Sequence, residues 1–540
     1  MTKAKRIVAA VLSLAMVIVV FSGCSKGNSG VETGELSDLK YGDTYPIETD
    51  TTLTYYMSMY AQARNEFTSY NELPLKKYLE EETGVKLEYI HPTQGANGDE
   101  QEFFNLMIAS NDLPDLIETG WYTYKGGAQA AINEEIIVPL NELLDKASPN
   151  LKKHYADNPE VAKMMRTDEG NYYMYPFFRG DEILMTYAGP MLRKDLLDKA
   201  GLPLPETIEE WDTALRAFKD QGLSIPLSLS LDNWSIQSSG NFLGAFGLMY
   251  EFYHDGNTVK YGSYDPKFKD YVTLLSKWYA DGLLDKDFTN REAKRITSEV
   301  VNGNVGAAFA AAGGGFGAWI ASMKDVVPEA EFEPAIYPVM NKGDQPFYGQ
   351  KDFPVLNVGV AISTKCKDVE LAARFLDYGY SEKGHMLYNF GREGVSYNMV
   401  GEIPTYTPEI LDKEKNGNVS VAQAMARHIR GNYNGPFVQN VHYINQFYTL
   451  QSQKDALPLW SNTDAQLHMM PFVSLTESET TEYTKIISDI NTYKEENLFK
   501  FISGKESLDN FDKYFADLKS MGIERAIEIQ QAAYDRYLKR

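Results

Sequence analysis

Apolar and polar positions along the chain form a pattern that predicts strands interspersed with helices. Strands are expected at residues 53–59, 85–89 and 113–118, helices at 75–84 and 102–110, and a short strand and a helix within 133–144. Gly84 follows the apolar positions of the first helical segment and is typical of a helix stop. Strands that alternate with helices indicate an α/β domain.

A second α/β region is expected after residue 187. Its helices are expected at residues 192–201, 210–219 and 271–280, and its strands at 305–311 and 335–339. Thr207 and Glu210 have the spacing of a capping box at the start of one of these helices. Residues 355–363 are typical of a buried strand that returns the chain to the first domain, so the lobes should be discontinuous in sequence.

The last third of the chain is expected to be mostly helical. From Phe511 onward, apolar residues at i, i+3, i+4 and i+7 form one face of a helix. We find no internal repeat of the kind that builds solenoids or propellers.

The amino terminus has the features of an export signal. Basic residues precede an uncharged run at residues 7–21, which is short for a membrane span. Phe21-Ser22-Gly23-Cys24 resembles the lipobox of bacterial lipoproteins, which implies that Cys24 becomes the first mature residue and carries the lipid. A plain secretory signal with an incidental cysteine is the alternative. We expect a signal peptide at 1–23 and a polar, glycine-rich, lipid-anchored tether at 24–50.

Composition narrows the class of partner. The 540-residue chain has 52 Lys and Arg against 75 Asp and Glu, a formal net charge of −23, which disfavours nucleic acid as a partner. Its 36 tyrosines suit a wet binding surface, and tyrosine-rich packing is the alternative explanation. Cys366 is the one other cysteine, so no intramolecular disulfide can form once Cys24 is acylated.

Several segments spread over the mature chain carry a family resemblance together with the lipobox. They are NDLPDLI at 111–117, RKDLLDKAGLPLPETIEEW at 193–211, WYADGLL at 278–284, GREGVSY at 391–397, KFISG at 500–504, MGI at 521–523 and AAYDRY at 532–537. In this order they resemble the extracellular solute-binding proteins (family 1 type) of carbohydrate ABC importers. The similarity is greatest to the large lipoprotein branch common in Firmicutes.

The resemblance implies a periplasmic-binding-protein-like α/β fold, in which hinge strands join two lobes and the C-terminal part is helical. Residues 51–185 with about 355–430 are expected to form the first lobe, 186–354 with about 431–500 the second, and 501–540 the C-terminal helices. The resemblance also implies a monomer held at the outer face of the cell membrane through Cys24. Such a protein captures an oligosaccharide in its cleft and hands it to ABC permease subunits.

A sugar site needs flat aromatic platforms for the C–H faces of the rings and planar polar side chains for the hydroxyls. Trp121 and Tyr122 come soon after a predicted strand, where an open α/β sheet places its ligand crevice, and Trp121 is therefore the first platform candidate. The other aromatic candidates, for which packing in the core is the alternative, are Trp234, Trp319, Tyr348, Trp460 and Tyr56.

Two charged pairs are candidates for polar contacts to the ligand. Arg179 and Asp181 lie in an aromatic-rich loop, where a surface salt bridge is the alternative. Arg392 and Glu393 belong to the GREGVSY segment, where a role in the fold around a helix junction is the alternative.

The sequence gives little support to an enzyme. It contains no G-x-S-x-G and no H-E-x-x-H motif, and its seven histidines are scattered. A half calcium loop at 412–417 has Gln423 where a bidentate glutamate belongs. We therefore expect no catalytic residues, no cofactor and no metal. A peptide-binding lipoprotein is the alternative function, followed by an exported glycoside hydrolase.

Overall fold

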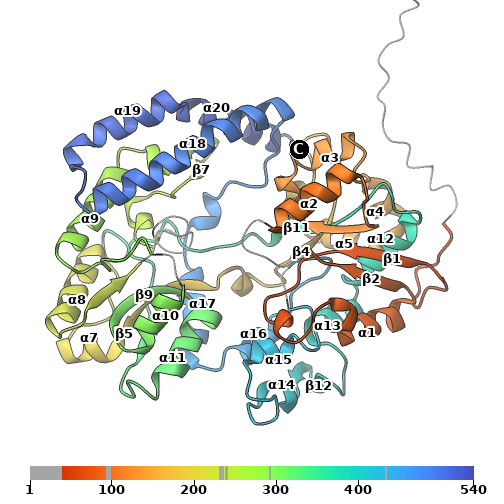
Figure 1. Cartoon of the computed structure of the whole chain (residues 1–540), viewed down its shortest axis with the longest axis horizontal. Coiled ribbons are helices and arrows are strands. Elements are labelled where there is room, and N and C mark those ends of the chain that lie inside the picture. The colour runs from red at the N-terminus through yellow and green to blue at the C-terminus, as the bar shows by residue number, and fades with distance from the viewer. Residues whose placement is uncertain (1–38, 93–98, 230–235, 237–240, 291–292, 432–433) are drawn as a thin grey trace, which may run out of the picture.

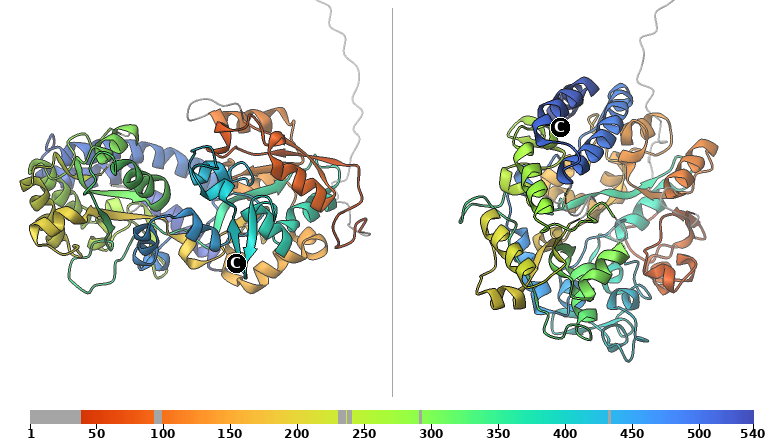
Figure 2. Two further views of the ribbon diagram at one scale, coloured as in Figure 1. Left: turned by 90° about the horizontal axis from the view of Figure 1, so that it is seen from below. Right: turned by 60° about the vertical axis from the view of Figure 1, so that its left-hand side comes forward.

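The computed structural model describes residues 39–540 except for 93–98, 230–235, 237–240, 291–292 and 432–433 (Figure 1). Figure 2 shows two lobes side by side, each built on its own sheet. Among the described helices, none is long and apolar enough to cross a membrane.

The sheet of the first lobe has the strand order β2-β1-β3-β11-β4 within the described residues. Its strands are β1 (Thr52–Tyr56), β2 (Lys86–Ile90), β3 (Leu116–Thr119), β4 (Tyr175–Phe178) and β11 (Val355–Ile362). Only β11 runs against its two neighbours, because it enters this lobe from the second one. The helices of this lobe are α1 (Pro74–Thr83), α2 (Asp99–Ser110), α3 (Gly127–Asn133), α4 (Asn141–Ala147), α5 (Pro149–Asp157), α6 (Pro159–Met164), α12 (Val369–Tyr378) and α13 (Glu382–Phe390).

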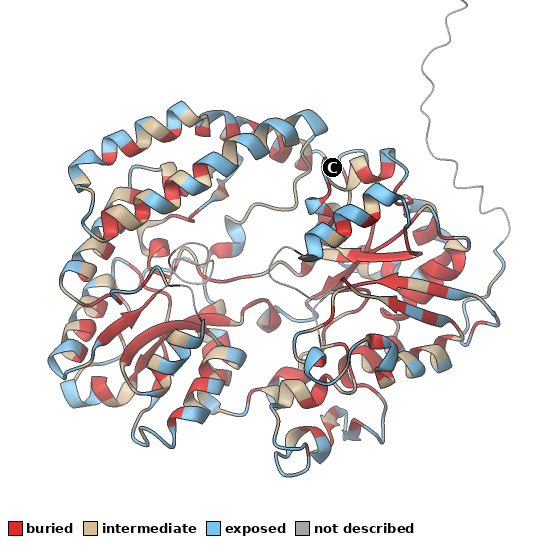
Figure 3. Cartoon of the chain, viewed as in Figure 1, coloured by how far each residue is buried: buried red, intermediate tan, exposed pale blue. Residues whose placement is uncertain are grey.

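The sheet of the second lobe has the order β10-β5-β9-β6 within the described residues. Its strands are β5 (Ala188–Arg193), β6 (Ile225–Ser228), β9 (Val305–Ala311) and β10 (Phe332–Pro334). The helices that follow them are α7 (Lys194–Ala200), α8 (Ile208–Asp220), α9 (Phe268–Ala280), α10 (Ala293–Val301) and α11 (Ala318–Met323), with a hairpin of β7 (Phe252–Asp255) and β8 (Thr258–Tyr261). Buried residues fall into two apolar clusters, one around each sheet, with exposed side chains on the outer helix faces (Figure 3).

The remaining elements belong to the last third of the chain. They are β12 (Tyr397–Val400), β13 (Ile403–Tyr406), α14 (Pro408–Leu411), α15 (Val421–Met425), α16 (His442–Phe447), α17 (Gln451–Ser461), α18 (Glu477–Ile502), α19 (Phe511–Met521) and α20 (Ile523–Tyr537). Helix α18 packs on α9 of the second lobe. The end of α20 reaches the first lobe, where Arg536 and Arg540 form ion pairs with Asp168 at 2.8 and 2.7 Å.

The chain crosses between the lobes where β4 leads towards β5 and again where it enters β11. The two crossings are hydrogen-bonded to each other: Arg179 N donates to Pro354 O at 2.8 Å, and Asp352 N donates to Met185 O at 2.7 Å. They form the hinge. The expected α/β fold with two lobes, hinge strands and a helical C-terminal part is confirmed.

Local expectations are confirmed where a short motif sets the structure. Gly84 ends α1 in the left-handed conformation, with φ 77°. Thr207 Oγ1 accepts a hydrogen bond from Glu210 N, and the Glu210 carboxylate accepts one from Thr207 N, each at 3.2 Å, so the capping box is confirmed.

Three expected elements are wrong in detail. Residues 335–339 are not a strand, because Val339 makes only an isolated bridge to Thr207 and the ladder ends at Pro334. The helix expected from residue 192 begins at Lys194, since the two residues before it pair within β5. No strand forms within 133–144, where Ile137 makes a single bridge to Ser363. In the first and third of these segments, apolar residues are buried without forming a strand ladder. The lobe boundaries stay a prediction, although α18 begins well before the expected helical part at 501.

Candidate functional site

A cavity of about 530 Å³ lies where the lobes meet, on one side of the hinge; we call it the interlobe cavity. The first lobe contributes Tyr60, in the loop after β1, and Leu356 of β11. The second lobe contributes Gly313 and Gly314, in the helical turn Ala312–Gly317 that follows β9. Loops at the carboxyl ends of parallel strands are where open α/β sheets hold ligands.

One wall of the interlobe cavity is aromatic. Tyr443 and Phe447, one helical turn apart on α16, have ring centroids 6.3 Å apart, and the Phe447 and Tyr448 centroids are 5.4 Å apart. A Cβ at Gly313 would lie 2.6 Å from the Phe447 ring, so a side chain at this position would require the ring to move. The other aromatic lining residues are Tyr60 and Tyr187.

The hinge side of the cavity carries an ion pair. Arg179 donates from Nε and Nη2 to Asp352 Oδ2 at 3.1 and 2.5 Å, and from Nη1 to Gln439 Oε1 at 2.9 Å. The Arg179 side chain is 7% exposed and that of Asp352 19%. Burial raises the pKa of Asp352 above its usual range and outweighs the opposite effect of Arg179. Gln439 in turn donates to the Tyr443 hydroxyl at 2.7 Å, which links the pair to the aromatic wall.

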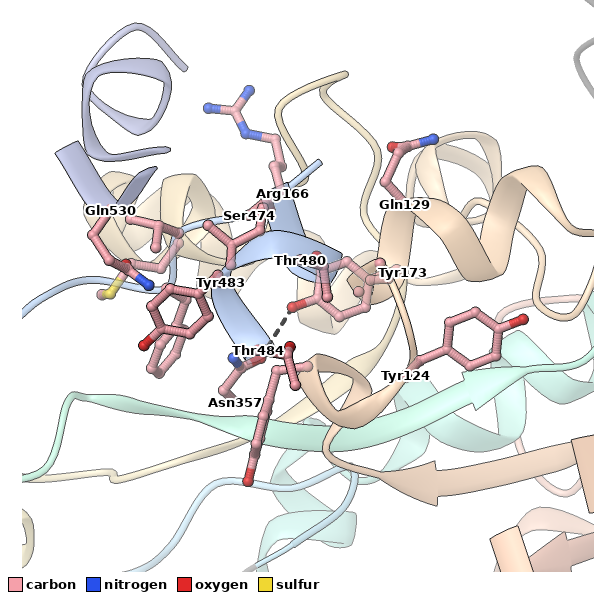
Figure 4. Close-up of a pocket in the computed structure, with 18 residues that line it drawn as sticks. Tyr124, Gln129, Arg166, Tyr173, Asn357, Ser474, Thr480, Tyr483, Thr484 and Gln530 are labelled. Carbon is pink, nitrogen blue, oxygen red and sulfur yellow. Dashed lines mark hydrogen bonds between the residues drawn. The ribbon is translucent and has the colours of Figure 1, made fainter. Parts of the chain in front are cut away.

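A second cavity of about 330 Å³ lies between the first lobe and the C-terminal helices (Figure 4). Asn357 lines it, while the preceding residue, Leu356, lines the interlobe cavity, as expected for neighbouring residues of a strand. Tyr173 donates to Asn357 Oδ1 at 3.1 Å. Thr480 and Thr484, one turn apart on α18, form part of the opposite wall.

Three of the tryptophans that were candidates for ligand contact are buried and packed against other residues. Trp121 has no exposed surface and lies edge-on to Phe104, with 6.0 Å between ring centroids. Trp460 is equally buried and donates from Nε1 to Ala335 O at 3.1 Å. Trp319 is 9% exposed and donates to Thr297 Oγ1 at 3.2 Å.

The other aromatic candidates differ in their exposure, and one of them lies outside the described residues. Tyr56 is 3% exposed and stacks on Phe103. Tyr348 is half-buried against Gly244. Tyr122 is 64% exposed at the second cavity, and Trp234 lies outside the described residues. For all of these aromatic candidates, ligand contact stays a prediction.

The polar predictions separate in space. Arg179 lines the interlobe cavity, whereas Asp181 is exposed and caps a short helical turn by accepting from Ile183 N at 3.0 Å. Arg392 and Glu393 line a different hollow, beside α13. There Arg392 is ion-paired with Glu81 and lies over the ring of Tyr78.

Most of the residues that line the interlobe cavity were not predicted from the sequence, among them Tyr60, Tyr187, Asp352, Tyr443 and Phe447. The spacing of Tyr443 and Phe447 was the available signal, since residues four positions apart lie on one face of a helix. Across the described ranges, no group of three or more His, Cys, Asp or Glu could hold a metal ion.

Comparison with known proteins gives one relative that spans nearly the whole chain and another that spans part of it. The fructooligosaccharide ABC transporter substrate-binding protein FusA of Streptococcus pneumoniae serotype 4 is 24% identical over 563 residues, covering 96% of each chain. The melibiose/raffinose/stachyose-binding protein MelE of Bacillus subtilis is 23% identical over 212 residues, covering 39% of this chain and 40% of MelE.

Solved structures share the fold. The alginate-binding protein AlgQ2 without calcium ion superposes with a TM-score of 0.70 at 26% identity, covering 90% of this chain and 99% of AlgQ2. FusA in complex with kestose gives 0.69 at 20% identity, covering 91% and 100%. The sequence model for bacterial extracellular solute-binding proteins matches residues 60–386, which is more than half of the chain. The chain therefore belongs to the family of bacterial extracellular solute-binding proteins.

Proposed function

We propose that this chain is the substrate-binding component of an ABC transporter that captures an oligosaccharide outside the cell and delivers it to the membrane permease. The interlobe cavity carries this proposal, because it combines an aromatic wall with the hinge pair of Arg179 and Asp352. Aromatic rings pack against the C–H faces of sugars, and planar polar groups bind their hydroxyls. A volume of about 530 Å³ is within the usual range of ligand pockets.

The position of the cavity suits capture by closure. Its lining comes from both lobes and from the hinge, so a ligand that touches all of them binds the closed arrangement better than the open one. A ligand can shift a hinge equilibrium only through such differential contacts. We propose that the permease recognises the closed form.

The names of the relatives support sugar as the ligand class. FusA is named for fructooligosaccharides and MelE for melibiose, raffinose and stachyose. AlgQ2, which shares the fold, is named for alginate. These names differ in the sugar, so they support the class and leave the individual ligand to experiment.

We propose that the chain has no catalytic activity. Asp352 is the one carboxylate among the described lining residues of the interlobe cavity, and Arg179 holds it. Glycoside hydrolysis generally uses a pair of carboxylates. Mass spectrometry of an oligosaccharide after long incubation with the protein should return the unchanged compound, and shorter products would support a hydrolase instead.

We propose that the mature protein is a monomer tethered to the outer face of the cell membrane through a lipid on Cys24, which lies outside the described residues. The protein should fractionate with membranes in cells. Cys24→Ala should move it to a soluble fraction, and an unchanged membrane association would contradict the anchor.

A thermal-shift screen of the mature protein against oligosaccharides of two to six units tests the function as a whole. A ligand that binds only the folded state stabilises it by about 2.7 kcal/mol at a hundredfold excess over Kd. We expect a raised Tm with at least one sugar series. An unchanged Tm with every sugar, together with a Tm raised by peptide mixtures, would favour a peptide-binding lipoprotein.

A further inference from the structure

The charged side chains of the interlobe cavity neutralise each other. Arg179 and Asp352 are the only Lys, Arg, Asp or Glu among its described lining residues, and their closest atoms, Nη2 and Oδ2, are 2.5 Å apart. Every other described lining residue is apolar, aromatic, a hydroxyl or an amide. The lining therefore offers no net charge to a ligand.

Protein groups already engage the guanidinium of Arg179 on each of its three nitrogens. An arginine that binds a carboxylate typically presents two parallel N–H groups to it. In Arg179 the groups at Nε and Nη2 both donate to Asp352, and Nη1 donates to Gln439. The side chain is also 93% buried, since 7% of it is exposed.

A uronic acid in this cavity would lose hydration without gaining an uncompensated cation. Its carboxylate would also approach Asp352, a group of the same charge. Burying an anion without a partner is costly, and like charges at close range discriminate strongly against a ligand. A neutral sugar has no anion to bury and no charge for Asp352 to repel, and its rings can pack against the aromatic wall.

We propose that the interlobe cavity selects neutral oligosaccharides over uronic-acid oligosaccharides, with Asp352 as the specificity-determining residue because it occupies the guanidinium of Arg179. This inference rests on the proposed function, since it concerns the ligand of the same cavity. The two-lobe fold itself does not set this preference, because the structurally similar AlgQ2 is an alginate-binding protein.

Calorimetric titration of the mature protein with matched probes tests the proposal. Fructo- and raffinose-series oligosaccharides are the neutral probes, and oligogalacturonates and alginate oligomers of equal length are the acidic ones. We expect binding of a neutral series and at least about hundredfold weaker binding of the acidic ones, which is a factor that two unfavourable charge contacts readily produce.

Asp352→Asn isolates the role of this residue. The amide keeps the shape but removes the negative charge that Arg179 donates to, so affinity for acidic oligomers should rise about tenfold or more. Arg179→Gln combined with Asp352→Asn removes both charges and should show no such gain. Asp325→Asn, the same chemical change at an exposed position, is the matched control and should behave as the native chain does.

The possible results distinguish a failure of the proposed neutral-sugar preference from a failure of the proposed oligosaccharide-binding function. Tight binding of acidic oligomers by the native chain would overturn the inference and leave oligosaccharide capture standing. A folded Asp352→Asn variant without any gain for acidic oligomers would overturn the role of Asp352. If no sugar binds and peptides do, both the inference and the proposed function fail. Native selectivity decides the question even if the Asp352 variant does not fold.

Discussion

Arg430 and Glu118 form an ion pair inside the first lobe, with Arg430 Nη2 2.6 Å from each carboxylate oxygen. Both side chains are 2% exposed. The Tyr55 hydroxyl donates to the same carboxylate at 2.7 Å. A Cβ at Gly435 would lie 2.5 Å from Arg430 Nη1, so the chain passes directly over the pair. The pair thus ties the end of β3 to the segment that leads to Asn434, which lines the interlobe cavity.

Glu118→Gln should lower the free energy of unfolding by about 3 to 5 kcal/mol, because it leaves a buried guanidinium without its counter-charge. Urea unfolding measures this. The matched control is Glu482→Gln, which breaks the exposed pair with Arg525, 46% and 48% exposed, and should cost less than about 1 kcal/mol. Equal effects of the two substitutions would contradict a structural role for the buried pair.

The Arg430–Glu118 pair could not have been predicted from the sequence. Its members are 312 positions apart, and no local periodicity reports such a contact. The capping box of Thr207 and Glu210 and the glycine stop at Gly84 were predictable, because each depends on residues within one helical turn. The alternation of strands and helices was predictable for the same reason, and it was enough to give the fold class.

The site was harder to predict than the fold. Arg179 was identified from its aromatic-rich loop, but its partner Asp352 lies 173 positions away and the pairing depends on the hinge. The sequence does not show which way a tryptophan points, because a ring after a strand can turn towards the core as readily as towards a cleft. Trp121 and Trp460 both have no exposed surface in the structure.

Phe447→Ala should weaken binding of the oligosaccharide about tenfold to a hundredfold, because it removes one face of the aromatic wall beside Gly313. Tyr122→Ala, at the second cavity, distinguishes the two cavities and should leave the affinity close to native. Calorimetric titration with the sugar found by the screen measures both. The reverse pattern would move the ligand to the second cavity.

Trp121→Ala should destabilise the first lobe by about 3 to 5 kcal/mol, because the indole has no exposed surface and its loss leaves a large cavity. For a ring that only lines a cleft, the role expected from its position after a predicted strand, the same substitution would leave the melting temperature nearly unchanged. The observed burial leads to the opposite expectation. A calorimetric Tm decides between them, and Trp121→Phe, which keeps an aromatic ring in place, should recover part of the loss. An unchanged Tm with lost binding would support the platform role.

Asp377 should make the free energy of unfolding depend on pH in a defined window. The residue is 1% exposed, and its carboxylate accepts hydrogen bonds from Leu151 N at 2.8 Å and from Asn150 N at 3.1 Å. Burial raises the pKa of Asp377 to about 6, in spite of these donors.

The sign follows from which state holds the proton. The ordinary pKa of aspartate is about 4, and the pKa of Asp377 in the folded protein is about 6. At a pH between these values, Asp377 is protonated in the folded protein and ionised in the unfolded chain. The contribution of Asp377 to stability is therefore fully present below about pH 4 and is lost as the pH rises to about 6, by on the order of 3 kcal/mol.

Asp377→Asn removes the titration. The difference in unfolding free energy between the native chain and the variant should therefore change between about pH 4 and pH 6 and be constant above that range. Urea unfolding at pH 4 to 7 measures that difference. Asp325→Asn, at an exposed position, is the control. A native-minus-variant difference for Asp377→Asn that does not vary with pH would show that the carboxyl titrates alike in both states.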